Sequence, residues 1–177
     1  MTNHSGVLQR ARTYAQSGQF PDMLIACQEA VDTHRNDFNV LLDTGVLLSN
    51  FGFISSAREC FKRVRILAPN DSRAVMNLAN LARDAGNHDE SRLLYATLLE
   101  RFPNHPVIRR NALISLEYDP LVSNIERLAQ AEEWGRWAIA LAGGHRSRPP
   151  PHSLQNERPL HIGYVSADFC QHTVGLF

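Results

Sequence analysis

The chain has 177 residues, of which 44% are hydrophobic and 20% charged, an ordinary composition for a folded protein and too apolar for general disorder. Lys and Arg together number 18, as do Asp and Glu, so no net charge attracts nucleic acid or an anionic membrane. The most apolar window, residues 38–57, is interrupted by Asp43 and Asn50 and contains no continuous apolar run of 18 residues. We therefore expect neither a nucleic-acid partner nor a membrane span.

The N-terminus and the cysteines indicate the cellular compartment. The opening residues lack a basic region followed by an apolar core, so they do not resemble a signal peptide. Cys27, Cys60 and Cys170 are odd in number and show no Cys-x-x-Cys spacing, which is typical of reduced thiols rather than a disulfide framework. The sequence predicts a cytoplasmic protein.

Three kinds of residue recur at intervals of 34 along residues 4–105. They are Gly18, Gly52 and Gly86; Asn36, Asn70 and Asn104; and Pro69 and Pro103. Thirty-four residues is the length of a tetratricopeptide repeat (TPR), a unit of two antiparallel helices, here called helix A and helix B. The spacing predicts an all-α TPR superhelical solenoid, with repeats at 4–37, 38–71 and 72–105.

The same period relates small residues on helix A to larger residues on helix B. The pairs are Ala11 with Cys27, Gly45 with Phe61, and Ala79 with Tyr95. A small residue lets the two helices approach, and the larger one fills the space that remains. The first repeat matches less well, because Arg10, Met23 and Arg35 depart from the pattern, as terminal repeats often do. The three glycines are expected to turn the chain in the left-handed conformation, and the Asn-Asp-Ser run at 70–72 to cap the next helix.

A row of polar residues on the A helices is a candidate peptide-binding groove, because stacked repeats curve with these helices on the concave side. Gln9, Asp43 and Asn77 lie 34 residues apart, and Asn80 lies one turn after Asn77. Such side chains can bond to the backbone of an extended peptide. Each residue taken alone is better explained as a polar group on a solvated helix face, whereas for the set at the 34-residue spacing the two interpretations are equally supported and both stay open.

The repeat pattern stops after residue 105, where Arg109 occupies a large apolar position. Residues 107–116 instead predict an amphipathic helix that covers the last repeat and ends at Tyr118-Asp119-Pro120. A longer helix is expected from about Ser123 to Leu141, and 106–142 form a capping and transition region. Its residues expected to pack are Leu128, Ala131, Trp134, Trp137, Ala138 and Leu141.

The last part of the sequence changes character. Residues 143–158 begin with two glycines and contain three consecutive prolines, which predicts a linker. Residues 159–177 include the β-rich run Leu160, Ile162, Tyr164 and Val165, typical of the first strand of an α/β domain. Because a parallel sheet needs a crossover helix and a second strand, we expect this domain to be truncated.

From residue 107 onward the sequence resembles the junction in bacterial SPINDLY-type protein O-GlcNAc transferases. The similar segments are Asn111-Ala-Leu-Ile-Ser-Leu-Glu-Tyr118-Asp-Pro, Trp134-Gly-Arg-Trp137, and Arg158-Pro-Leu-His-Ile-Gly-Tyr-Val-Ser-Ala-Asp-Phe169, followed by His172 and Gly175. The resemblance implies that 159–177 begin a Rossmann-like glycosyltransferase domain. That domain transfers N-acetylglucosamine from UDP-GlcNAc to Ser or Thr of proteins, without a metal or other cofactor, and the TPR groove holds the protein substrate.

The resemblance also implies a role for His172, which matches a family histidine beside the active site, although Thr173 follows it where the family often has proline. The nucleotide-binding lobe would lie beyond residue 177, so we expect this chain alone to be inactive. Two alternatives stay open: a non-catalytic TPR adaptor, and a protein O-fucosyltransferase of the same family that uses GDP-fucose. The spacing of His145, His152, His161 and His172 matches no metal-ligand pattern.

Overall fold

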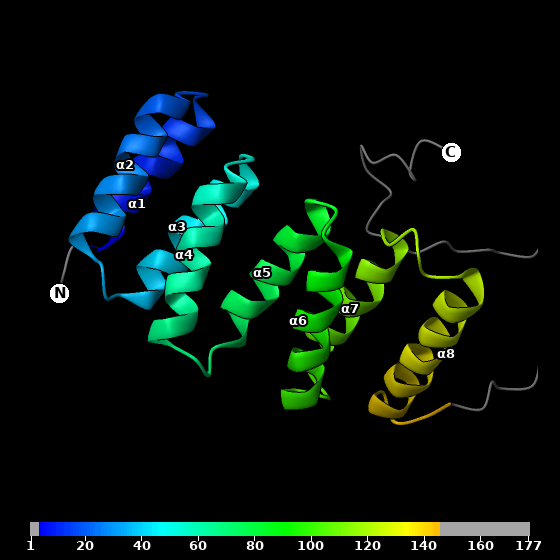
Figure 1. Cartoon of the computed structure of the whole chain (residues 1–177). Helices are drawn as coiled ribbons and strands as arrows, with labels where there is room; N and C mark the ends of the chain where they lie inside the picture. The colour runs from blue at the N-terminus through cyan, green and yellow to red at the C-terminus, as the bar shows by residue number, and fades with distance from the viewer. Residues whose placement is uncertain (1–3, 146–177) are drawn as a thin grey trace, which may run out of the picture. The chain divides into compact units, whose positions relative to one another are not determined.

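The computed structural model describes residues 4–145, and the regular structure of these residues is entirely α-helical (Figure 1). Residues 1–142 form one compact unit, and 143–177 belong to a second unit, of which only 143–145 are among the described residues. Most of the expected linker, the expected strand within 159–177 and His172 therefore lie outside the described residues. The helices are α1 (His4–Gln16), α2 (Phe20–Thr33), α3 (Phe38–Asn50), α4 (Ile54–Leu67), α5 (Ser72–Asp84), α6 (His88–Arg101), α7 (Pro106–Glu117) and α8 (Asn124–Leu141).

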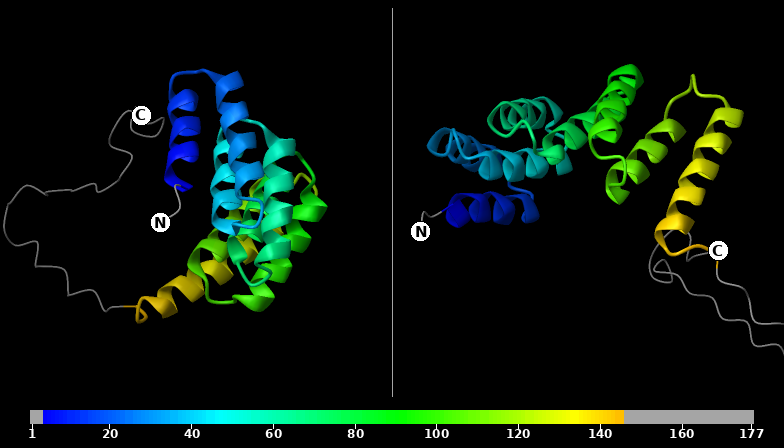
Figure 2. Two further views of the ribbon diagram at one scale, coloured as in Figure 1. Left: turned by 90° about the vertical axis from the view of Figure 1, so that its left-hand side faces the viewer. Right: turned by 90° about the horizontal axis from the view of Figure 1, so that it is seen from below.

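The helices follow the 34-residue period closely. The A helices α1, α3 and α5 begin at residues 4, 38 and 72, and the B helices α2, α4 and α6 begin at 20, 54 and 88. Each A helix packs against the B helix that follows it, and the resulting hairpins stack one after another (Figures 1 and 2). The first three pairs therefore form the predicted TPR-like solenoid.

Glycine makes each turn from helix A to helix B. Gly18, Gly52 and Gly86 have φ angles of 72°, 80° and 76°, in the left-handed region. A Cβ at any of the three would meet no neighbour within 4 Å, so the requirement for glycine comes from the backbone angle and not from crowding. This confirms the left-handed turns expected from the sequence.

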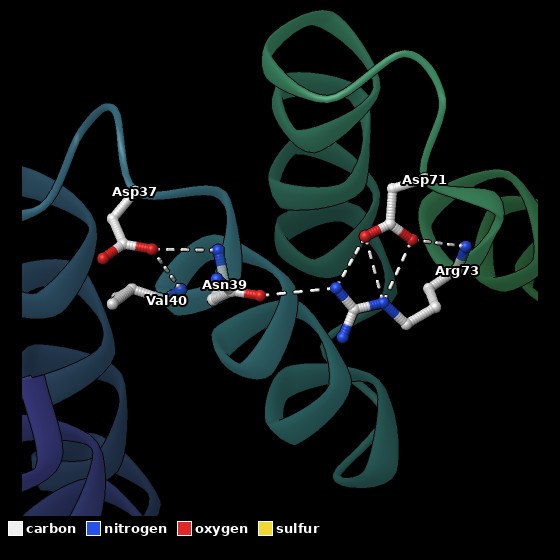
Figure 3. A network of polar contacts seen from close by, with 5 residues as sticks. All are labelled: Asp37, Asn39, Val40, Asp71 and Arg73. Atoms are coloured by element: carbon white, nitrogen blue, oxygen red, sulfur yellow. Dashed lines mark hydrogen bonds and ion pairs between the residues drawn. The ribbon is translucent and has the colours of Figure 1, made fainter.

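Aspartate caps the A helices of the second and third pairs (Figure 3). Asp37 accepts hydrogen bonds from the backbone N–H groups of Asn39 and Val40, and Asp71 accepts one from Arg73 N–H. The Arg73 guanidinium also donates to the Asp71 carboxylate and to Asn39 Oδ1 at 3.3 Å. Since Asn39 lies on α3 and Arg73 on α5, this network joins the first turns of two consecutive A helices.

The core follows the expected pairing of small and large residues. A Cβ placed on Gly45 would lie 2.6 Å from Phe61 Cε1, so the aromatic ring occupies the space that glycine leaves open. Both residues are buried in a cluster that extends from the first pair into α5. Met23, which fits the repeat pattern poorly, is also fully buried in this cluster, so the first pair fills its core with a different side chain.

The fourth helical pair, α7 and α8, departs from this packing. The position that holds a small residue in the other A helices holds Leu113 in α7. The position that holds the larger residue in the other B helices holds Ala129 in α8. The sizes are therefore reversed, and Ala129 is exposed. No residue of α8 is buried. Leu128 is 62% exposed and Leu141 65% exposed. Of the six α8 residues expected to pack, Trp134, Trp137 and Ala138 are half-buried, whereas Leu128, Ala131 and Leu141 are exposed, and for these three the expectation is wrong.

Polar contacts attach α8 to the preceding helices. The Arg127 guanidinium donates to the backbone carbonyls of Leu116 (3.2 Å) and Asp119 (2.7 Å). The Asp119 side chain is buried and accepts from Leu121 N–H, and its Oδ2 lies 3.0 Å from Arg92 Nη1 in an ion pair. These contacts, together with the buried side chain of Val122, fix the connection between α7 and α8.

Two of the three recurring asparagines, Asn70 and Asn104, connect one helical pair to the next. Asn70 Oδ1 accepts a hydrogen bond from Arg101 Nη2 at 3.0 Å, and Asn104 Oδ1 accepts one from Trp137 Nε1 at 3.3 Å. In both cases the donor lies at or near the end of the following B helix, α6 or α8. The 34-residue phase of these two asparagines therefore has a structural reason.

Candidate peptide-binding groove

The A helices lie on the more closely spaced side of the solenoid. Helix α1 contacts α3, α3 contacts α5, and α5 contacts α7. Among the described helices, α2, α4 and α6 make no comparable contact with one another. Because elements are closer together on the inside of a curve, the exposed faces of the A helices form the concave side.

Three predicted groove residues occupy the same position on successive A helices. Gln9 on α1 and Asp43 on α3 are exposed, and Asn77 on α5 is half-buried. Asp43 Oδ2 lies 3.4 Å from Arg12 Nη2 of α1, so the groove acid is paired with a base from the preceding repeat. The amides of Gln9 and Asn77 offer both donors and acceptors for a peptide backbone.

Asn80, the fourth predicted groove residue, is held by the core. Its side-chain oxygen accepts a hydrogen bond from the Tyr95 hydroxyl of α6. Burial raises the pKa of Tyr95 to about 12, so the phenol keeps its proton at neutral pH. Tyr95 is the large residue of the third pair, and it therefore both fills the core and positions an amide of the groove.

Two further groove residues were not predicted. Asn111 of α7 lies 34 residues after Asn77 and is half-buried. Arg73 lies 34 residues after Asn39, and its contact with Asn39 is described above. The period itself could have identified both. Asn111 was missed because the mismatch at Arg109 ended the repeat assignment before α7, and Arg73 was missed because its 34-residue relation to Asn39 was not considered.

The charges of this surface are largely compensated. Arg12 faces Asp43, and Arg73 faces Asp71. The hydrogen bonds from Arg73 lower the pKa of Asp71 and outweigh the opposing effect of burial, so this carboxylate is ionised at neutral pH. A groove of amides with balanced charges suits the backbone of a peptide better than a highly charged ligand.

The described residues offer no metal site and no membrane span. Within residues 4–145, no group of three or more His, Cys, Asp and Glu side chains is placed to hold a metal ion. Of the helices in the same range, none is long and apolar enough to cross a bilayer.

Comparison with known proteins supports the repeat assignment. Residues 42–106 match the tetratricopeptide repeat family. This range covers most of the second pair and the whole of the third. No curated protein sequence matched the chain.

Several solved structures share the fold. A variant of the O-GlcNAc transferase from Thermobaculum terrenum superimposes with a TM-score of 0.70 at 23% identity, and the match covers 98% of this chain and 33% of that one. MamA from Desulfovibrio magneticus RS-1 superimposes with a TM-score of 0.58 at 17% identity, over 81% of this chain and 78% of that one. Another MamA structure gives 0.60 at 14% identity, over 80% of each chain.

These identities establish the fold alone. The chain spans about one third of the length of the Thermobaculum protein and about four fifths of the length of MamA. Together with the family match over residues 42–106, they show that residues 4–145 form an all-helical, TPR-like solenoid of eight helices.

Proposed function

We propose that this chain is the substrate-binding part of a SPINDLY-type protein O-GlcNAc transferase, in which the concave groove holds an extended segment of the acceptor protein. The observation that carries the proposal is the row of Gln9, Asp43 and Asn77 on successive A helices. The structural match to part of an O-GlcNAc transferase, which covers 98% of this chain, supports it.

In this proposal, binding and chemistry belong to different parts of the protein. The groove amides bond to the peptide backbone, so acceptors of varied sequence are tolerated. A glycosyltransferase domain continuing from residue 159 holds UDP-GlcNAc and transfers the sugar to a Ser or Thr hydroxyl without a metal. Its phosphate site stabilises the leaving diphosphate. His172, which lies outside the described residues, receives or orients the acceptor proton, since an imidazole titrates near neutral pH.

The test compares this chain alone with the same chain continued by its downstream coding sequence. Each is given UDP-GlcNAc and a Ser/Thr-rich acceptor protein, and added sugar is measured by mass spectrometry. We expect the longer protein to be active and the 177-residue chain to be inactive. Transfer by the 177-residue chain alone would contradict the assignment of binding and catalysis to different parts of the protein.

Variants of the longer protein separate the two roles. Replacing Asp43 and Asn77 with Ala should raise KM for the protein acceptor and leave kcat nearly unchanged, because it removes ground-state binding. His172→Ala should lower kcat and leave acceptor binding unchanged. The matched control replaces Gln28 and Asp32, an amide and an acid exposed on the B helix α2, and should change neither constant.

A non-catalytic adaptor is the second candidate function. It is favoured by the MamA structures, in which a similar fold accounts for about four fifths of the chain. A longer protein that binds acceptors and transfers no sugar would support the adaptor. Transfer from GDP-fucose in place of UDP-GlcNAc would instead identify an O-fucosyltransferase.

A further inference from the structure

A cavity of about 220 Å³ lies between α6, α7 and α8. On α7 it is bounded by Ala112, Leu113 and Leu116, whereas the groove position of the same helix is Asn111. At 3.6 residues per turn, Leu113 and Leu116 project about 140–160° around α7 from Asn111, and Ala112 about 100° from it. The cavity thus lies mainly on another side of α7 from the concave groove, and Tyr95, which bonds to Asn80, also lines it. What it binds does not depend on the proposed function.

The reversed sizes at Leu113 and Ala129 explain why the cavity exists. In the first three pairs a large B residue fills the space beside a small A residue, as Phe61 does beside Gly45. In the fourth pair α8 offers only Ala129, which is exposed, and Leu113 adds bulk on α7. Helix α8 is consequently held away from α6 and α7 by its polar contacts, and the space between them stays open.

The cavity is lined by apolar side chains of α6 and α7 and by polar or charged side chains of all three helices, among them Arg92 and Arg109. Ala96 and Leu99 of α6 face it together with the apolar residues of α7. Helix α8 contributes Glu126, Gln130 and Trp134 at steps of four residues, which places them in one row along the helix. An apolar space bordered by a few polar groups is the usual form of a binding pocket.

Two groups in this row lack partners. Trp134 Nε1 is buried and donates to no acceptor among the described residues. A buried N–H without an acceptor is costly, so a ligand that supplies one is favoured. The Glu126 carboxylate forms no ion pair within residues 4–145, whereas Glu133 on the same helix is paired with Arg109 at 3.4 Å. The unpaired charge favours a cationic neighbour.

We propose that this cavity is a second protein-docking site, which receives one bulky apolar side chain from an extended segment of a partner protein. The backbone carbonyl next to that side chain accepts a hydrogen bond from Trp134 Nε1, and a basic residue that follows it pairs with Glu126. The volume is sufficient, because a cavity of about 150 Å³ already binds a benzene ring. Gln130, between the two, bonds to the peptide backbone.

The chain contains two tryptophans, so its two indole N–H signals in a ¹H–¹⁵N NMR spectrum provide a direct test. The probe is the peptide acetyl-Gly-Phe-Lys-Gly-amide added to the ¹⁵N-labelled 177-residue chain. The Trp134 signal should move downfield as its N–H gains an acceptor. The Trp137 signal should stay in place, because its Nε1 already donates to Asn104.

Peptide and protein variants then test each element of the proposal. Replacing Phe of the peptide by Ala, or the cavity residue Ala96 by Phe, should weaken binding about tenfold or more, since either change removes the burial of one large apolar side chain. Replacing Lys by Glu in the peptide should weaken binding as well. The control Thr97→Phe, at the neighbouring exposed position of α6, should leave the affinity unchanged. A Trp134 signal that does not respond to the probe, or an affinity unaffected by Ala96→Phe, would overturn the proposal.

Discussion

The contact between Gly45 and Phe61 shows how a single position determines helix spacing. The Phe61 ring lies where a Cβ of residue 45 would stand, so any side chain there must displace the ring or separate α3 from α4. Gly135 on α8 provides the opposite case, because a Cβ at that position would meet nothing within 4 Å. A side chain would therefore clash at Gly45 and would fit at Gly135.

We predict that Gly45→Leu lowers the free energy of unfolding by about 1–3 kcal/mol or more, through overpacking against Phe61. Gly135→Ala should leave stability unchanged or raise it by up to about 1 kcal/mol, because alanine is the better helix former and the site is open. Urea unfolding followed by circular dichroism measures both. Equal effects of the two substitutions would contradict the packing that we describe.

Asp71 combines a helix cap with an ion pair, and pH separates the two contributions. The hydrogen bonds from Arg73 lower the pKa of Asp71 in the folded state. The stabilisation is therefore complete above the pKa of the unfolded chain, about 4, and is lost as the pH falls through the lower folded value. Asparagine keeps the capping oxygen and lacks the charge.

We expect Asp71→Asn to be less stable than the natural chain at pH 7, and the difference to shrink as the pH approaches 3. Asp71→Ala also loses the cap, which costs about 0.5–2 kcal/mol, so it should remain less stable than Asp71→Asn at both pH values. The midpoint of urea unfolding at pH 7, 5 and 3 provides the measurement. A difference between Asp and Asn that is the same at pH 7 and pH 3 would exclude the ion pair as its source.

At the scale of the element, the helices differ in whether buried side chains or hydrogen bonds hold them in place. Helices α3 to α6 bury residues such as Leu41, Phe61 and Leu98, whereas α8 buries none and depends on the two Arg127 bonds and on Trp137. Hydrogen bonds of this kind each contribute about 1 kcal/mol, so local opening of α8 requires less free energy than opening of the inner helices.

We predict that Arg127→Ala increases amide hydrogen exchange in α8 by about fivefold to tenfold and leaves α3 and α4 unchanged, since one or two bonds to carbonyls are lost. Exchange measured by mass spectrometry on the native chain resolves the two regions. As a control, Arg136→Ala removes a long, exposed i,i+4 ion pair of α8 with Glu132 and should have little effect. Faster exchange throughout the chain would show that Arg127 supports the whole solenoid.

How far the sequence predicts this structure differs between the elements. The glycine period predicts α1 to α6 and their turns, because a repeat must return the chain to the same backbone conformation every 34 residues. It does not predict the Tyr95–Asn80 bond, which depends on side-chain orientations in two helices. The glycine period also does not predict the Arg92–Asp119 and Arg127 contacts, because the link between α7 and α8 occurs only once in the chain and is not part of the repeat. The apolar content of α8 predicts that Leu128 is buried, yet it is exposed. The reversed sizes at Leu113 and Ala129 are the signal that this helix does not pack as the other B helices do.

On the scale of the whole solenoid, two hydrophobic clusters meet along α5. One cluster includes Leu78 and Leu81 and continues back to α1. The other includes Val75 and Ala79 and continues to Ile108 of α7. Repeat proteins gain stability mainly from neighbouring units, so damage in one cluster is expected to affect its own units most.

We predict that Phe61→Ala lowers the free energy of unfolding by about 3–5 kcal/mol and speeds hydrogen exchange from α1 to α5. Ile108→Ala, at an equally buried site, should speed exchange mainly in α6 and α7. Native-state hydrogen exchange of both variants at matched total destabilisation distinguishes them. Identical patterns of exchange would indicate one fully cooperative unit in place of two neighbouring clusters.

The exact 34-residue spacing of the helix starts also bears on how such a chain can change in length. A copy of residues 38–71 inserted after Asp71 would bring its own glycine turn, its own Gly45–Phe61 pair and its own capping aspartate. Its junction with α5 would repeat the existing one, and its junction with α4 would keep the same 34-residue spacing. The reversed pair at Leu113 and Ala129 offers no such junction, and a copy inserted after residue 141 would have no matching surface to join. The array can therefore grow from within and not from its C-terminal side, and each added unit would extend the row of groove side chains by one position.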